Sequence, residues 1–274
     1  METLRFDNLS QYLLLKNGNY LYKVPFRGDH AVLKVYYGDR STWQYWTKTF
    51  GNVVLANQTS FMPKARRRVE KECLKLWGDA GFRVFGTYDD VKVEGIPEGG
   101  YTMFEWVPGV QFVDYFSKKS DATDDEKMAM WRRFVPEWHR RHRLCVDQKE
   151  PRFVHENGDL KHVMIYKDEL VYFDFEMCFR SPRRVKEFVA REILAYLKSL
   201  GKTVGAEQWD TYLEETVKLY DSKELLAFTH QFAFENSNPF LRVARALDRM
   251  LKPRASKPFA KYNVARKLKG FLET

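Results

Sequence analysis

Cysteine is scarce in this sequence, and the three that occur, Cys73, Cys145 and Cys178, lie far apart and form no C-x-x-C pair. An odd number of widely spaced cysteines provides neither a disulfide framework nor a zinc-binding pattern. We therefore expect a protein of a reducing compartment, most simply the cytoplasm, without structural disulfides.

Long apolar runs are also missing. No segment reaches the ~18 consecutive apolar residues that a membrane-spanning helix needs. The N-terminal stretch METLRFDNLSQYLLLKNG contains a short apolar run with neither a basic start nor a small-residue cleavage site. The sequence predicts a protein that does not span a membrane and carries no standard secretion signal.

Apolar and basic residues, by contrast, are plentiful. The 274 residues are 44% hydrophobic and 16% aromatic, which is ample for one large domain or two small lobes. The formal net charge of +9 suggests an anionic partner. A nucleotide, a phosphorylated glycan, an acidic membrane surface and nucleic acid all fit this charge, and charge alone does not choose among them.

The first ~110 residues carry strand patterns, with β-rich runs separated by turn-forming residues. The runs QYLLLK, YLYKVPF and AVLKVYY, separated by NGN and RGDH, predict an antiparallel three-strand meander. Pro63 is expected to begin a helix, and FRVFGTYDDVKVEG and GYTMFEWV to form further strands. The stretch 43–61 shows no assignable pattern.

The pattern becomes helical after Gly109. A long helix is expected to begin at Thr123 or Asp124 and to be interrupted at Pro136. A short hairpin, MIYKDELVYFDF, follows, and the chain from Arg183 onward is expected to be helical in several pieces. The fold class is thus predicted as α+β, with a small antiparallel β-rich part over 1–107 and a larger helical part over 108–274.

Lys34 and Glu70 are candidates for binding phosphate. Lys34 lies centrally in an apolar strand, where a cation is held rigidly, and a carboxylate would orient it. On a helical wheel Glu70 lies about 60° from the centre of the apolar face, whereas Glu72 lies about 100° away on the other side. Taken singly, each residue is better explained as an ordinary strand lysine or a surface glutamate.

Asp159 and Asp174 are candidates for the acceptor and metal sides of phosphoryl transfer. That chemistry needs one carboxylate near the acceptor hydroxyl and another on Mg²⁺. Asp159 follows Gly158 in a loop, and Asp174 ends the apolar strand LVYF. Each alone is also explained as a turn cap or a strand end.

The order of these features resembles the protein-kinase-like superfamily. AVLK resembles the V-A-I-K strand, GDL resembles the catalytic loop of atypical kinases that reads HGDL, and DFE resembles the D-F-G metal motif. The helix that carries Glu70 is similar to that of the bacterial lipopolysaccharide core (heptose/Kdo) kinases and of the Rio-like branch. The resemblance runs from about Leu13 to Glu176.

This resemblance implies a two-lobed kinase fold, with an ATP-binding N-lobe over 1–107 and a C-lobe over 108–274. In the N-lobe it implies that Gly18 and Lys34 contact the ATP phosphates, that Glu70 pairs with Lys34, and that Glu105 to Val107 form the hinge that reads adenine.

In the C-lobe the resemblance implies that Asp159 is the catalytic base and Asp174 the principal ligand of Mg²⁺ or Mn²⁺. The position five residues after Asp159, usually Asn, is Met164, whose thioether is a poor ligand for a hard cation. Glu176 is the expected replacement as a metal ligand, ahead of His162.

Other features depart from the pattern of regulated protein kinases. NGN supplies one certain glycine, and no A-P-E sequence follows Asp174, so the segment after it is short. A compact segment fits small-molecule and glycan kinases better than kinases that dock peptides.

Three basic clusters were considered as binding surfaces. ARRRVEK is expected to be a solvated face, whereas RSPRRVK is expected to hold a phosphate or carboxylate through Arg183 or Arg184. The C-terminal run, with Phe259, Tyr262, Leu268 and Phe271 interleaved, fits either an anionic membrane surface or a packed final helix.

The sequence therefore predicts an ATP- and Mg²⁺-dependent kinase that phosphorylates a hydroxyl of an anionic glycan or glycolipid. By resemblance, the acceptor is a sugar of the lipopolysaccharide inner core, and the protein is cytoplasmic or peripheral to the inner membrane. A Rio-like protein Ser/Thr kinase and a nucleotide-binding pseudokinase, favoured by Met164, remain alternatives. No motif supports nucleic-acid binding.

Overall fold

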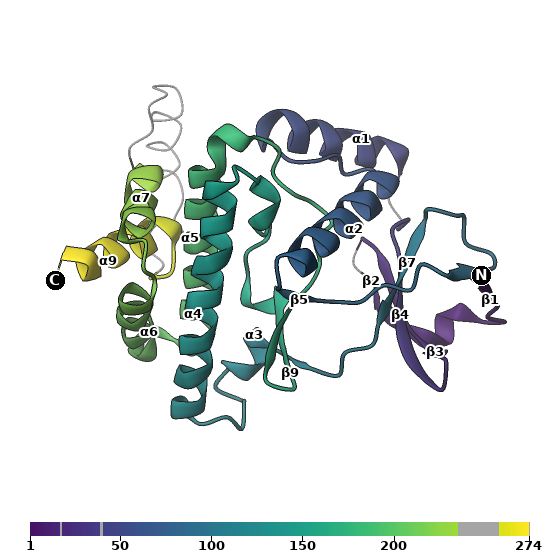
Figure 1. Cartoon of the computed structure of the whole chain (residues 1–274), viewed down its shortest axis with the longest axis horizontal. Coiled ribbons are helices and arrows are strands. Elements are labelled where there is room, and N and C mark those ends of the chain that lie inside the picture. The colour runs from purple at the N-terminus through teal and green to yellow at the C-terminus, as the bar shows by residue number, and fades with distance from the viewer. Residues whose placement is uncertain (17, 39–40, 235–257, 274) are drawn as a thin grey trace. The chain divides into compact units, whose positions relative to one another are not determined.

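A computed structural model describes residues 1–16, 18–38, 41–234 and 258–273 (Figure 1). The chain forms two compact units, each with its own internal contacts. Unit 1 comprises Met1–Gly109 and Tyr166–Arg180, and unit 2 comprises Val110–Ile165 and Ser181–Thr274. Residues Tyr166–Arg180, expected with the helical part, thus group with the β-rich part. The α+β class is confirmed.

Unit 1 is built on an antiparallel sheet of four strands. Its order is β2 (Leu13–Lys16), β3 (Tyr20–Phe26), β4 (Asp29–Val35) and β7 (Tyr101–Glu105). The predicted three-strand meander is therefore confirmed, with a register shift in β2. Two short parallel pairs complete the unit, β1 (Glu2–Leu4) with β6 (Val91–Val93) and β5 (Arg83–Val84) with β10 (Glu169–Tyr172).

One face of this sheet packs on an apolar core, and Lys34 lies on the other face. Successive side chains of a strand point to opposite faces. Ala31 and Leu33 of β4 are fully buried in the core, which also receives Val91 and Val93 of β6. Lys34 lies between the core residues Leu33 and Val35, so it faces away from that core, and it pairs with Leu21 of β3 and Thr102 of β7.

Helix α2 (Pro63–Asp79) lies in the same unit and begins at Pro63, as predicted. It ends before Gly81, whose φ of 77° closes the helix in the left-handed conformation. Its Trp77 ring packs against Tyr172 and Phe175, with centroids 5.2 and 4.5 Å apart. The late segment Tyr166–Arg180 is thereby fixed to the helix that carries Glu70.

The stretch that showed no assignable pattern is helical. Ser41 caps α1 (Thr42–Phe50) through a reciprocal capping box with Gln44, and a π-helical turn (Gly51–Leu55) continues it. The chain then forms a bridge between Gln58 and Phe179 before it enters α2.

Unit 2 is helical around an aromatic core. Its helices are α3 (Phe112–Tyr115), α4 (Asp124–Asp147), α5 (Val185–Val204), α6 (Ala206–Leu219), α7 (Lys223–Phe234) and α9 (Lys261–Glu273). Strand β8 (Val110–Gln111) pairs with β9 (Val163–Tyr166). Short 3₁₀ turns cover Pro151–Phe153, Leu160–His162 and Pro182–Arg184, and another, Leu9–Tyr12, lies in unit 1. No helix among the described residues is both long and apolar enough to cross a bilayer.

The predicted interruption at Pro136 is wrong, because α4 runs through it without a break. A proline removes one helical hydrogen bond and costs about 3 kcal/mol. Pro136 lies on the exposed side of α4, so the carbonyl it leaves unpaired faces water. On the other side Trp131, Phe134 and Trp138 are fully buried, and their packing holds the helix together.

The C-terminal helix packs within unit 2. Tyr262, Val264 and Leu268 of α9 are buried, and α9 contacts α5, α6 and α7. Of the two interpretations of the C-terminal basic run, the packed helix is therefore correct for 258–273. The beginning of that run, 252–257, lies outside the described residues.

Candidate functional site

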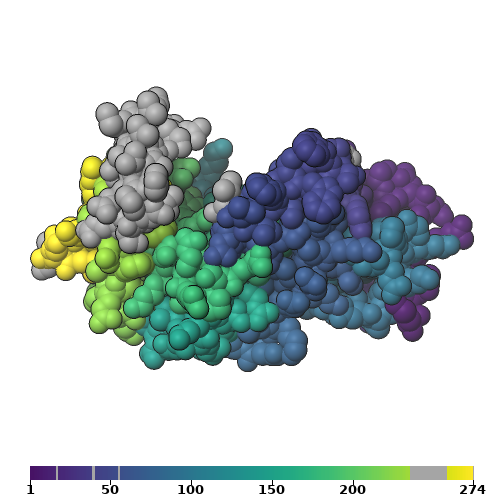
Figure 2. Space-filling model, turned by 90° about the horizontal axis from the view of Figure 1, so that it is seen from above, coloured from purple at the N-terminus to yellow at the C-terminus, as the bar shows by residue number. Residues whose placement is uncertain are grey.

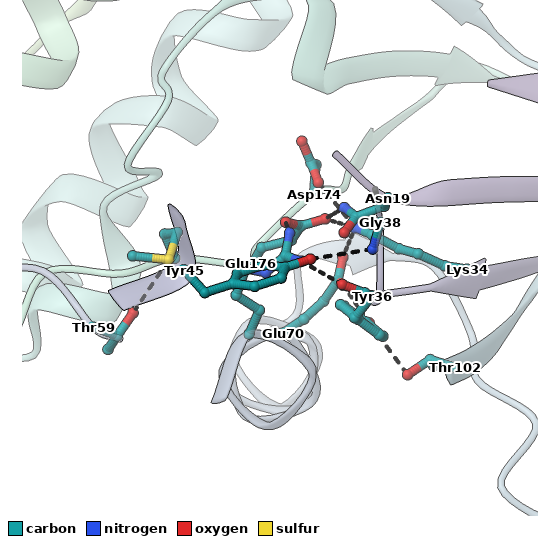
Figure 3. A network of polar contacts seen from close by, with 12 residues as sticks. Asn19, Lys34, Tyr36, Gly38, Tyr45, Thr59, Glu70, Thr102, Asp174 and Glu176 are labelled. Carbon is teal, nitrogen blue, oxygen red and sulfur yellow. Dashed lines mark hydrogen bonds and ion pairs between the residues drawn. The ribbon is translucent and has the colours of Figure 1, made fainter. Parts of the chain in front are cut away.

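Lys34 is the centre of a buried ionic cluster in unit 1 (Figure 3). Its side chain is 5% exposed, and its Nζ lies 2.9 Å from Glu70 Oε1 and 2.9 Å from Asp174 Oδ1. A third carboxylate, Glu176, contacts the same nitrogen at 2.7 Å. Lys34 and Glu70, predicted from the sequence as a cation and its orienting carboxylate, therefore form a direct ion pair. Both carboxylates of FDFE also contact Lys34.

Helix geometry explains why Glu70 and not Glu72 reaches Lys34. Glu70 shares the buried face of α2 with Val69 and Cys73, whereas Glu72 is exposed. The wheel-based prediction is thus confirmed. The remaining Glu70 oxygen, Oε2, lies 2.5 Å from the Tyr36 hydroxyl, which is buried as well. Glu70 is held from two sides and has little freedom to rotate.

Three carboxylates surround the single ammonium group of Lys34, and this excess of negative charge shifts the pKa values in the cluster. Burial by itself lowers the pKa of Lys34, but Asp174, Glu176 and Glu70 outweigh burial and hold that pKa well above its ordinary value. Burial raises the pKa of Glu70 to about 7, although Lys34 opposes the rise. Lys34 therefore stays charged, and burial makes Glu70 easier to protonate than an ordinary glutamate.

Arg66 supplies a second cation to the cluster. It lies one helical turn before Glu70 and is 1% exposed. Its guanidinium donates to Glu176 Oε2 at 2.7 Å and to the carbonyl oxygen of Tyr36 at 2.5 Å. The expectation that ARRRVEK is a solvated face is therefore wrong for this residue, because α2 turns Arg66 inward while Arg68 remains exposed.

Glu176 is held on both oxygens. Lys34 and the amide of Asn19 contact Oε1, and Arg66 contacts Oε2. Asn19 follows Gly18, whose φ of 75° lies in the left-handed region. A Cβ on Gly38 would lie 2.7 Å from the Gly18 carbonyl oxygen, so this turn and the end of β4 approach closely. The turn is thereby tied to the ionic cluster.

Asp174 is the most accessible carboxylate of the cluster. Its side chain is 37% exposed, against 3% for Glu70 and 13% for Glu176. Its φ of 69° is uncommon for a residue other than glycine. Such a conformation persists only when its surroundings hold it, and buried Phe175 packs against Trp77 directly beside it.

The predicted hinge residues lie at the end of β7. The Glu105 backbone N–H donates to the Gly86 carbonyl at 3.0 Å, and its carboxylate accepts from the Gly86 N–H at 2.7 Å. Burial would raise the pKa of Glu105, but Arg83, 2.6 Å away, and the Gly86 N–H lower it. Val107 is buried. These contacts fix the position of the segment.

Asp159 lies in unit 2, at the start of the 3₁₀ turn Leu160–His162. Its Oδ1 accepts hydrogen bonds from the Ser199 hydroxyl at 2.8 Å and from the Lys161 N–H at 3.1 Å. Ser199 belongs to α5, so a helix far along the sequence orients the proposed base. His162 Nδ1 donates to the Asn157 carbonyl oxygen, 2.7 Å away, because a carbonyl oxygen can only accept.

A buried ionic network supports the loop before Asp159. Glu192 of α5 is 1% exposed and binds Arg141 at 2.9 Å through Oε1. The same oxygen accepts the His155 backbone N–H at 2.7 Å, and Oε2 contacts His142 Nε2. Arg141 also donates to the Phe153 carbonyl at 2.6 Å. The network therefore holds the loop backbone at two points.

Electrostatics in this network favour one protonation state. Burial would raise the pKa of Glu192, but Arg141 and His142 lower it to about 2. Burial lowers the pKa of His142 to about 4, although Glu192 opposes the shift. At neutral pH the network is thus an ionised Arg141–Glu192 pair with a neutral His142, whose Nδ1 lies 2.8 Å from the Tyr220 hydroxyl.

Gly158 is required by the close approach of this loop to α5. A Cβ at Gly158 would lie 2.5 Å from Glu192 Cγ and 3.1 Å from the Tyr196 ring. Glu192 cannot move aside without leaving Arg141. We expect Gly158→Ala to lower the free energy of unfolding by about 1–3 kcal/mol, measured by urea denaturation.

Gly51→Ala is the matched control for this substitution. Gly51 has φ of −58°, and a Cβ there meets nothing within 4 Å. Its replacement should leave stability unchanged or raise it by about 0.4–1 kcal/mol. Equal effects of the two substitutions would contradict the close contact at Gly158.

Met164, at the position where an asparagine is expected, lies in a strand ladder. It pairs with Gln111 of β8 and is half-buried. Among the described residues, no group of three His, Cys, Asp or Glu side chains is arranged to hold a metal ion. Mg²⁺ is commonly bound by one or two carboxylates together with substrate phosphates, and Asp174 offers such a carboxylate.

Sequence patterns missed several residues of these two clusters. Tyr36, Asn19 and Arg66 around Lys34, and Ser199 and Glu192 around the Asp159 loop, were not singled out. The i, i+4 spacing of Arg66 and Glu70 on the apolar side of α2 was the available signal for Arg66. Of the basic pair expected to hold an anion, Arg184 is exposed and pairs with Glu187 at 2.7 Å.

No family model and no curated protein matches this chain. Among solved structures it is similar to WaaP in complex with acyl carrier protein, at 14% identity and a TM-score of 0.41, over 81% of this chain and 88% of that one. It is also similar to the Rio2 kinase from Chaetomium thermophilum in its ADP/Mg²⁺-phosphoaspartate complex, at 12% identity and a TM-score of 0.41. That match covers 94% of this chain and 70% of that one.

A second Rio2 structure from the same organism gives the same identity and TM-score over 93% of this chain and 71% of that one. Similarities of this size assign no activity, substrate or residue role.

Proposed function

We propose that this protein is an ATP- and Mg²⁺-dependent phosphotransferase. The observation that carries the proposal is the buried Lys34 ammonium, held at 2.9 Å from both Glu70 of α2 and Asp174 of FDFE. A lysine fixed by a helix carboxylate beside an accessible aspartate is the arrangement that phosphoryl transfer from ATP needs.

In this proposal Lys34 binds the ATP phosphates, and Glu70 prevents it from swinging on its flexible stem. Asp174, the exposed carboxylate, holds Mg²⁺, or Mn²⁺ in its place, which supplies positive charge to the transferred phosphoryl group. Gly18 brings the NGN turn over the phosphates, and the backbone of Glu105 to Val107 binds adenine.

We also propose Glu176 as a second metal ligand, although two cations already contact its carboxylate. Arg66 and Lys34 together neutralise it at 2.7 Å each. A metal ion would have to displace at least one of these cations from Glu176 before binding there. Without metal, Glu176 orients Lys34 and Arg66.

Asp159 is proposed as the base that accepts the proton of the acceptor hydroxyl. The contacts of Ser199 and Lys161 both fall on Oδ1, which fixes the carboxylate and leaves Oδ2 for the acceptor. We propose that the acceptor is a hydroxyl of an anionic glycan, a sugar of the lipopolysaccharide inner core. The motif resemblance and the net charge of +9 support this choice, as does the short segment that follows Asp174. The protein would then act in the cytoplasm or at the inner membrane.

The test is phosphate transfer from labelled ATP, with Mg²⁺ or Mn²⁺, to core-oligosaccharide fragments and to a generic protein substrate. We expect metal-dependent transfer to the fragments and a loss of about 10²–10⁴-fold in Asp159→Ala. Asp121→Ala, an exposed loop aspartate, is the control and should remain active. Transfer to serine of the protein substrate alone would favour a Rio-like protein kinase.

Nucleotide binding without turnover is the second candidate, favoured by Met164 at the usual asparagine position. A thioether does not replace an amide oxygen on Mg²⁺. This candidate would be correct if ATP raises the melting temperature of the wild type while neither the wild type nor Asp159→Ala consumes ATP with either metal.

A further inference from the structure

Helix α1 and the turn after it carry a stripe of exposed apolar side chains. Trp43 is 74% exposed, Trp46 59%, Phe50 65% and Val54 59%. At 100° per residue the three α1 members lie within about 60° of one another, on one side of the helix. Single exposed apolar residues are ordinary, but a contiguous stripe marks an interaction surface.

The opposite side of α1 is fixed to the body of unit 1. Tyr45 is buried, its hydroxyl accepts the Gly38 N–H at 3.2 Å, and its ring lies 6.1 Å from that of Phe61. Thr49 accepts the Phe61 N–H at 3.1 Å. Rotation of α1 to bury the stripe would break these contacts. In Figure 1 α1 lies along the outer edge of unit 1, and Figure 2 is viewed from that side.

The sequence around the stripe has only one sign of charge. No aspartate or glutamate occurs from Ser41 to Val69, whereas Lys48, Lys64 and a run of three arginines do. Lys48 and Lys64 are exposed. The stripe is thus flanked by positive charge, which complements an anionic partner.

We propose that α1 is an interfacial anchor that binds the surface of an anionic lipid bilayer. Tryptophan favours the boundary between headgroups and acyl chains, where its apolar ring and its polar N–H are both accommodated. Phenylalanine adds apolar area to the buried face of such a helix. Lys48 and Lys64 would contact the anionic headgroups. A helix of this kind lies in the interface with its apolar face buried and needs no membrane-spanning length.

The features favour a bilayer over a protein partner. The side chains that would be buried lie on one side of α1 and the turn after it, and they are two tryptophans, a phenylalanine and a valine. Lys48 is the single charged residue of the sequence between Trp43 and Val54. This is an aromatic, positively flanked surface suited to a fluid interface.

The test is co-sedimentation with vesicles of phosphatidylcholine alone and of phosphatidylcholine with about 30% phosphatidylglycerol, an anionic lipid. The wild type should bind the anionic vesicles, and higher salt should weaken the binding by screening the charges. Trp43→Ser with Trp46→Ser should reduce binding about tenfold or more, because the main buried apolar area is lost. Brominated acyl chains should quench tryptophan fluorescence in the wild type and not in this variant.

Leu14→Ser with Leu15→Ser is the matched control, since both leucines are exposed by about half, 51% and 52%, on β2. It should bind vesicles like the wild type. All four residues are exposed, so both variants should keep the wild-type melting temperature. Unchanged binding of the tryptophan variant would overturn the proposal. Equal binding of the wild type to both kinds of vesicle would also overturn it. The proposal would likewise be wrong if the wild type bound no vesicles and the tryptophans were needed instead for self-association or for binding an acidic protein. The measurement requires no turnover and is independent of the proposed activity.

Discussion

Replacing Lys34 with methionine is expected to lower kcat/KM for ATP by about 10²–10³-fold, the usual effect of removing one preorganised charge from an active site. Methionine keeps the length of the side chain but not its charge. Glu70, Asp174 and Glu176 all contact Lys34 Nζ within 2.9 Å, so the variant would leave three carboxylates around an uncharged group. The phosphates would then meet repulsion where the wild type offers a cation.

The measurement combines steady-state kinetics with an ATP titration followed by thermal shift, which separates weakened nucleotide binding from unfolding. Lys92→Met is the control, because Lys92 also lies in a strand of unit 1, β6, but is exposed. It should retain wild-type kinetics. A Lys34→Met protein that is folded and as active as Lys92→Met would show that Lys34 is not a phosphate ligand.

Glu192→Gln is expected to lower the free energy of unfolding by about 3–5 kcal/mol, the usual cost of removing one member of a buried ion pair. Glutamine keeps the shape of the side chain but removes the carboxylate charge that the fully buried Arg141 contacts at 2.9 Å. The His155 N–H would keep an acceptor, so the loss would come mainly from the charge. Urea denaturation at neutral pH, with intrinsic fluorescence as the probe, measures the difference.

Glu187→Gln is the matched control on the same helix. Glu187 pairs with Arg184 at the surface, where both side chains are more than a third exposed. Exposed ion pairs contribute about 0–1 kcal/mol, so this variant should differ little from the wild type. Similar small losses in both variants would mean that the Arg141–Glu192 pair does not stabilise unit 2.

The sequence identified the site residues whose position follows from the regular spacing of apolar residues along a strand or a helix. Lys34 was found because an apolar strand surrounds it, and Glu70 because its position on the helical wheel separates it from Glu72. Arg66 was not identified because it belongs to a run of three arginines, and such a run ordinarily indicates a solvated face. Only the way α2 packs decides which of the three turns inward.

Contacts between distant segments could not be predicted. Ser199 reaches Asp159 from 40 positions away, and Asn19 reaches Glu176 from 157 positions away. Neither serine nor asparagine stands out in a sequence, because each is common in loops and on surfaces. The continuity of α4 through Pro136 likewise depends on tertiary packing of Trp131 and Trp138, which overrides local propensity.

The division of unit 1 into two segments has a consequence for its biosynthesis. Residues 110–165 are made before the segment that supplies Asp174 and Glu176. A nascent chain that ends at Gly109 therefore holds Lys34 with Glu70 but without Asp174 and Glu176, Arg66 without Glu176, and Trp77 without the rings of Tyr172 and Phe175. Burying two cations against one carboxylate is costly. The β-rich unit can thus complete its ionic centre only after the ribosome has translated through Arg180, although most of its residues come first.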